Sequence, residues 1–123
     1  MVSQKILVLV VEDEPLVRIS IVAELEDHGL QVMEASNAHE AIAVLGDNPV
    51  VNVIFTDVDM PGSIDGIELA KIVRERFPPI QVVVTSGHRN VIQSDLPPEA
   101  KFIPKPYVSE QIVKTILEIA AVR

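Results

Sequence analysis

Residues 6–15, ILVLVVEDEP, join an unbroken apolar run to an acidic cluster and a proline. The run from Ile6 to Val11 is aliphatic throughout and mostly β-branched, which is typical of a strand covered on both faces. Pro15 suits the first turn of a helix, which we expect to continue to His28 before Gly29 ends it. This stretch therefore predicts a buried strand, an acidic turn and a helix.

The same alternation continues along the chain. Further strands are expected at 31–35, 50–56, 80–85 and 101–103, and further helices after the capping residues Asn37, Asp65 and Ser109. The last helix is expected to bury Ile112, Val113, Ile116, Leu117 and Ala120. The segment from Gly87 to Ala100 has few apolar residues and two adjacent prolines, so the fourth helix should be short or irregular.

Strands that alternate with helices form a parallel sheet with helices on both faces. For five such units, the favoured fold is the flavodoxin-like (βα)₅ doubly wound sheet with strand order 2-1-3-4-5. A length of 123 residues fits one domain, so we expect a single domain over 1–123 with no output domain in this chain.

Composition excludes several classes of protein. The chain has no cysteine, which rules out disulfide scaffolds and cysteine-ligated zinc. Its net charge of −8 disfavours direct contact with nucleic acid. No apolar run approaches the ~18 residues of a membrane span. We therefore expect a cytoplasmic protein that binds neither membranes nor nucleic acid.

Polar side chains cluster at the ends of the expected strands. These residues are Glu12, Asp13, Asp57, Asp59, Ser86 and Lys105. Because the carboxyl ends of parallel strands meet at one edge of the sheet, these side chains should share a crevice. Crowded carboxylates stay ionised only beside a cation, and an all-oxygen ligand set favours Mg²⁺. A carboxylate nucleophile beside a metal ion, a lysine and a hydroxyl is the arrangement that forms an aspartyl-phosphate.

These residues resemble the receiver domain of two-component response regulators. The matching fragments are Val-Glu-Asp-Glu-Pro at 11–15, Thr-Asp-Val-Asp-Met-Pro-Gly at 56–62, Asp-Gly at 65–66, Thr-Ser-Gly-His at 85–88 and Lys-Pro-Tyr at 105–107. The fragments follow in order across essentially the whole chain. One departure is a loop after Asp59 that is one residue longer than the commonest family pattern.

The resemblance implies a role for each residue of the acidic crevice. Asp57 is the expected phosphoacceptor, and Lys105 is the expected ion-pair partner of the phosphoryl group. Asp57 is also an expected Mg²⁺ residue, with Asp13 binding the ion directly and Glu12 through water. Asp59 is expected to contribute its backbone carbonyl, the alternative being that its side chain only faces solvent.

The resemblance also implies a switch and its partners. Ser86 is the expected switch hydroxyl, and Phe102 is the aromatic that would fill the space Ser86 leaves; plain core packing is the alternative for Phe102. The Lys105–Pro106 bond is expected to be cis. A histidine kinase or histidine phosphotransfer protein would donate the phosphoryl group. The downstream protein is unknown, and a homodimer formed on phosphorylation is left open.

The first helix is apolar almost all round, more than one packed stripe requires. The excess predicts either a docking face or extra core contact. The residues expected to dock a partner are Pro15, Arg18, Ile19 and Val22.

Two other functions compete with the phosphorylation switch, which would catalyse only its own phosphorylation and dephosphorylation. One is a docking module of the same fold that works without phosphorylation. The other is a phosphatase, because Asp57-Val58-Asp59 resembles the Asp-x-Asp motif of the haloacid-dehalogenase type. Pro61 departs from that motif, and Glu12 and Asp13 have no place in it.

Overall fold

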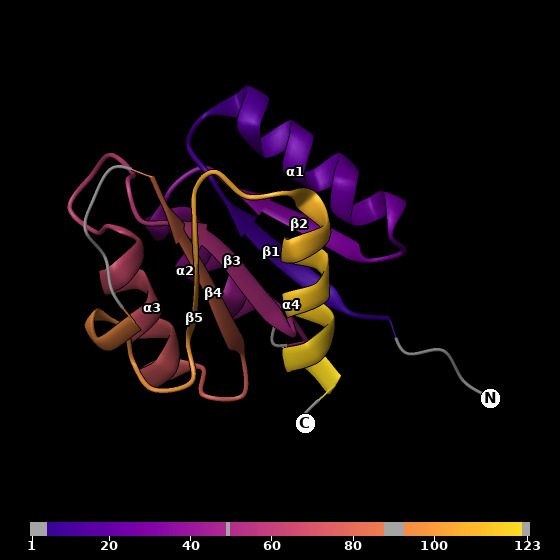
Figure 1. The fold of residues 1–123 in the computed structure, drawn as a ribbon. Coiled ribbons are helices and arrows are strands. Elements are labelled where there is room, and N and C mark those ends of the chain that lie inside the picture. Colours follow the sequence, from indigo (N-terminus) through magenta and orange to yellow (C-terminus); the bar gives the residue numbers. More distant parts are fainter. Residues whose placement is uncertain (1–4, 49, 88–92, 122–123) are drawn as a thin grey trace.

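Five parallel strands form the sheet predicted from the sequence. The computed structural model describes residues 5–48, 50–87 and 93–121 (Figure 1). The strands are β1 (Leu7–Val11), β2 (Gln31–Ala35), β3 (Val53–Asp57), β4 (Gln81–Ser86) and β5 (Lys101–Pro104). They pair in the order β2-β1-β3-β4-β5, which confirms the flavodoxin-like topology.

Helices cover both faces of this sheet. They are α1 (Pro15–Asp27), α2 (Ala38–Asp47), α3 (Gly66–Arg76) and α4 (Ser109–Ala121). Figure 1 shows α1 and α4 on one face and α2 and α3 on the other, and the two core clusters divide in the same way. None of the helices in the described part of the chain is long and apolar enough to cross a membrane.

Local signals set the starts of α2 and α3. The side chain of Asn37 accepts a hydrogen bond from the backbone N–H of Glu40, and that of Asp65 does the same for Glu68. Both caps satisfy an N–H that has no partner within its helix. The two predicted capping residues are therefore confirmed, while Ser109 lies inside α4 as its first residue.

The segment between β4 and β5 contains little regular structure. Its described part has a single three-residue 3₁₀ turn, η1 (Gln93–Asp95). This agrees with the expected short or irregular helix, although His88 and the rest of 88–92 lie outside the described residues. Among the described residues, the fourth α-helix, α4, thus follows β5.

In α1 and α4, some apolar residues are exposed instead of packing in the core. Only Ile21 and Leu25 of α1 are buried, whereas Leu16 and Ile19 are 81% and 59% exposed. Of the excess apolar residues of α1, Leu16, Ile19 and Ala23 therefore lie on the surface, whereas Val17 and Val22 pack half-buried against the core. In α4 the prediction that Leu117 points inward is wrong: Ile119 takes the buried position, because it continues the face of the helix that contacts the sheet.

The N-terminus of α3 packs directly on the end of β3. The backbone N–H of Gly66 donates to the carbonyl of Val58 at 3.0 Å. A Cβ atom at Gly66 would overlap the carbonyl oxygen of Asp57 and lie 2.6 Å from Val58 Cα. Only glycine allows this approach, so Gly66 holds α3 against the strand that carries Asp57.

We predict that Gly66→Ala lowers the free energy of unfolding by about 1–3 kcal/mol, because backbone atoms cannot yield to the added methyl group. Gly46→Ala in α2 is the matched control, since nothing lies within 4 Å of its added Cβ. The control should gain up to about 1 kcal/mol from helix propensity. Urea unfolding measures both variants, and equal changes in the two would contradict the predicted contact.

Candidate functional site

Asp57 ends β3 at the carboxyl edge of the sheet, with only 4% of its surface exposed. Its Oδ1 accepts the backbone N–H of Asp59 at 3.0 Å. Its Oδ2 accepts a hydrogen bond from Lys105 Nζ at 2.6 Å, which is also an ion pair. A buried carboxylate is thus held by one cation and one amide, as a charged group in a protein interior requires.

Lys105 reaches Asp57 from the turn after β5. Its backbone N–H donates to the carbonyl of Ser86 at 3.0 Å, and its bond to Pro106 is cis, as predicted. Burial lowers the pKa of Lys105, but the hydrogen bond and charge of Asp57 outweigh burial and raise that pKa above its usual value. Lys105 therefore stays protonated beside Asp57.

Glu12 is the second buried acid at this edge and is 3% exposed. Its backbone N–H donates to the carbonyl of Ala35, and its Oε2 accepts the backbone N–H of Glu14. Burial raises the pKa of Glu12 to about 7; the hydrogen bond from Glu14 opposes this shift, and the neighbouring Asp57 carboxylate adds to it. Two buried carboxylates thus share the charge of one lysine.

Asp13, next to Glu12, has a partly exposed side chain that makes no hydrogen bond or ion pair within the described residues. No group of three or more histidine and acidic side chains in the described ranges is placed closely enough to hold a metal ion. The donors nevertheless fit Mg²⁺, because Glu12, Asp13 and Asp57 offer only oxygen and Mg²⁺ usually keeps several waters. The predicted ligation by these residues and Asp59 stays a prediction.

Ser86 and Asp59 are joined by a hydrogen bond. Ser86 Oγ donates to Asp59 Oδ2 at 3.0 Å, so the Asp59 side chain does more than face solvent. Ser86 shares a sheet face with Val84, because alternate residues of a strand point the same way. Phe102 is half-buried and packs against the core cluster on that face, which contains Val84. Thr85, the residue before Ser86 in β4, points to the other face of the sheet. Ser86 is therefore the hydroxyl on the side of Phe102.

Two side chains at this edge were not singled out from the sequence. Thr85 Oγ1 is buried without a hydrogen-bond partner among the described residues. The ring of Tyr107 packs edge-on against Phe55 with centroids 6.2 Å apart, and burial raises its pKa. The Lys-Pro-Tyr fragment was the available signal for Tyr107, whereas burial of Thr85 depends on which face of β4 it occupies.

The four residues expected to dock a partner differ in exposure. Pro15 and Ile19 are exposed, and Val22 is half-buried. Arg18 is bound within the molecule: its Nη1 donates to the carbonyl of Glu12 at 2.7 Å. Its guanidinium is therefore not freely displayed on α1.

Comparisons with known proteins agree with this fold. Residues 8–117 match the response regulator receiver domain family. The chain is 33% identical over 110 residues to an NtrX-like response regulator of Rickettsia felis, covering 86% of this chain and 23% of that protein. It is 34% identical over 116 residues to the sensor kinase CckA of Brucella abortus, covering 91% of this chain and 12% of that protein.

A solved structure gives the same result. The receiver domain of NtrX from Brucella abortus is 28% identical to the chain, with a TM-score of 0.85 over 94% of this chain and 99% of that one. The chain belongs to the response regulator receiver domain family. It spans less than a quarter of the length of the two curated relatives above.

We predict that Glu12→Gln stabilises the Mg²⁺-free protein at pH 8 but not at pH 4.5. The pKa of Glu12 is about 7 in the folded protein, compared with 4.5 for an unperturbed glutamate, the value taken for the unfolded chain. Raising the pH from 4.5 to 7 therefore ionises Glu12 first in the unfolded chain, and the wild type loses stability over this window. Glutamine stays neutral, so the variant should avoid a loss on the order of 2 kcal/mol.

Urea unfolding in EDTA at the two pH values measures the difference. Glu14→Gln is the control, because the Glu14 side chain is exposed next to the same loop. A Glu12→Gln effect of equal size at both pH values would contradict the raised pKa.

Proposed function

We propose that the chain is a phosphorylation switch in which Asp57 accepts a phosphoryl group from a phosphohistidine, with Mg²⁺ required. The observation that carries this proposal is the ion pair between Lys105 Nζ and the buried Asp57 Oδ2 at 2.6 Å, beside Glu12 with its raised pKa. A carboxylate held by one lysine among other acids suits a reaction that brings in more negative charge together with a cation.

The transfer would be an in-line displacement. A carboxylate oxygen of Asp57 forms the new bond to phosphorus, and the bond from phosphorus to the histidine nitrogen breaks. The electron pair of that bond stays on the imidazole of the donor. Mg²⁺, when bound, would neutralise charge on the phosphoryl oxygens. Lys105 keeps its proton and supplies a second positive charge.

Phosphorylation would then change the state of Ser86. In the structure its hydroxyl is committed to Asp59. A phosphoryl group on Asp57 competes for this donor, because its oxygens carry more charge than a carboxylate. Phe102 would follow into the space that Ser86 leaves. Phe102 lines a groove of about 640 Å³ between β5 and α4, so its movement alters that surface as a population shift.

The donor would dock on α1. The exposed apolar residues Leu16 and Ile19 of α1 form a face that nothing within the described chain covers. A histidine kinase or histidine phosphotransfer protein is the proposed partner, and the setting is the cytoplasm. Similarity to both a sensor kinase and response regulators supports this kind of partner.

We predict that the protein gains one phosphoryl group when incubated with Mg²⁺ and acetyl phosphate, as measured by intact mass. EDTA should abolish the gain, because Mg²⁺ neutralises the approaching charge. Asp57→Asn should abolish it as well. Asp59→Asn should still gain mass, since Asp59 is not the acceptor.

Three results would contradict the proposal. Equal mass gain in the wild type and Asp57→Asn would place the phosphoryl group elsewhere. Failure to gain mass from either acetyl phosphate or a phosphorylated histidine kinase would favour the docking module. Steady turnover of a phosphomonoester that Asp59→Asn abolishes would favour the phosphatase.

A further inference from the structure

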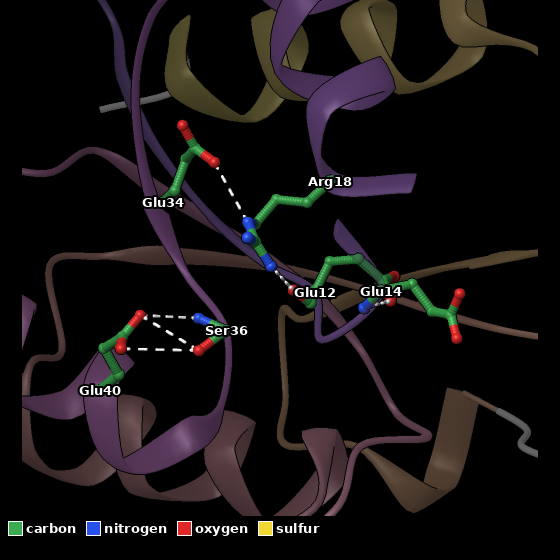
Figure 2. Close-up of polar contacts among 6 residues, drawn as sticks. All are labelled: Glu12, Glu14, Arg18, Glu34, Ser36 and Glu40. Carbon is green, nitrogen blue, oxygen red and sulfur yellow. Dashed lines mark hydrogen bonds and ion pairs between the residues drawn. The ribbon is translucent and has the colours of Figure 1, made fainter. Parts of the chain in front are cut away.

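The Arg18 side chain bridges three parts of the fold. Its Nη1 donates to the carbonyl of Glu12 at 2.7 Å, and its Nε pairs with Glu34 Oε1 at 3.1 Å. Figure 2 shows the side chain extending from α1 toward Glu34 on β2 and toward residues 12–14, which are called the acidic loop below. The Arg18 side chain is only 19% exposed. These contacts, between Arg18, Glu34 and the Glu12 carbonyl, are called the Arg18 bridge below.

The carbonyl that Arg18 binds belongs to the peptide unit between Glu12 and Asp13. A peptide unit is planar, so the direction of this carbonyl sets where the Asp13 backbone continues. The other polar groups of Glu12 are also held: its N–H donates to Ala35, and its carboxylate accepts from Glu14. Arg18 therefore binds the backbone carbonyl of Glu12, while the backbone N–H of Glu12 is bound by Ala35.

Glu34 orients the guanidinium for this task. The Glu34 side chain is 48% exposed, so its ion pair contributes little free energy by itself. Its effect is geometric, because a planar guanidinium fixed at Nε presents Nη1 in one direction. The positive charge of the Arg18 guanidinium also lies beside the acidic loop, which carries three acidic residues. Both effects favour the observed course of the acidic loop.

We propose that Arg18 is a positioning residue for the divalent-cation site, acting through the Glu12–Asp13 peptide unit; this inference rests on the proposed function. The bridge fixes the backbone that carries Glu12 and Asp13, beside Asp57, before the cation arrives. Without the Arg18 bridge, the acidic loop becomes ordered only when the cation binds. The free energy of ordering the loop then opposes binding, so the affinity for the cation falls. The role differs from the docking contact expected of Arg18.

The matched control lies elsewhere in the same chain. Arg74 also joins a backbone carbonyl to a glutamate: its Nη1 donates to Pro78 at 3.1 Å, and its Nη2 pairs with Glu99 at 2.9 Å. Arg74 lies in α3 and its bridge does not involve the acidic loop. Arg74→Met removes a similar set of contacts without touching the proposed site.

The test measures Mg²⁺ affinity by titration of backbone amide NMR shifts in unphosphorylated protein. Arg18→Met should weaken Mg²⁺ binding by about 10-fold or more, the usual effect of losing a group that orients metal ligands. Arg18→Lys should recover part of the affinity, and Glu34→Gln should lose less than Arg18→Met. Arg74→Met should bind Mg²⁺ as the wild type does.

Melting temperatures with Mg²⁺ and with EDTA give a second readout. Arg18→Met should reduce the rise in melting temperature on adding Mg²⁺, whereas Arg74→Met should lower both melting temperatures and leave that rise unchanged. Unchanged Mg²⁺ affinity in Arg18→Met would overturn the positioning role alone. If Arg18→Met does not fold, unchanged affinity in both Arg18→Lys and Glu34→Gln overturns it. A wild type that does not bind Mg²⁺ would overturn the proposed function as well.

Discussion

Two buried carboxyl groups, those of Glu12 and Asp57, lie at the ends of the neighbouring strands β1 and β3. Lys105 satisfies Asp57 at 2.6 Å, and burial leaves Glu12 with a pKa of about 7. Placing negative charge in a protein interior is costly, so the site is held in a state that a cation would relieve. The surrounding structure serves to keep these groups together in spite of that cost.

The order of the strands in the sheet is the main reason why these groups lie together. Because β1 and β4 both pair with β3, Glu12 after β1 and Ser86 at the end of β4 flank Asp57, and the turn after β5 brings Lys105 alongside. The helices then fix the loops: α3 presses on the end of β3 at Gly66, and α1 holds the acidic loop through Arg18. Fold and site are thus one arrangement, since loosening either helix would loosen the carboxylates.

Much of this arrangement could be predicted from the sequence, because apolar runs and capping residues are local signals. They gave the five strands, the caps at Asn37 and Asp65, and the edge at which the polar residues meet. Side-chain directions were less accessible. The bond from Ser86 to Asp59 and the reach of Arg18 to Glu12 depend on how elements pack, and Leu117 was misplaced because several faces of α4 are apolar.

The most direct test of this account is the pKa of Glu12, measured by ¹³C NMR titration of its side-chain carboxyl in metal-free protein. The account predicts a value of about 7. Saturating Mg²⁺ should lower that pKa, because a bound cation favours the ionised carboxylate. A pKa near 4.5 in the metal-free protein, unchanged by Mg²⁺, would contradict the claim that crowded buried charge prepares this site for a cation.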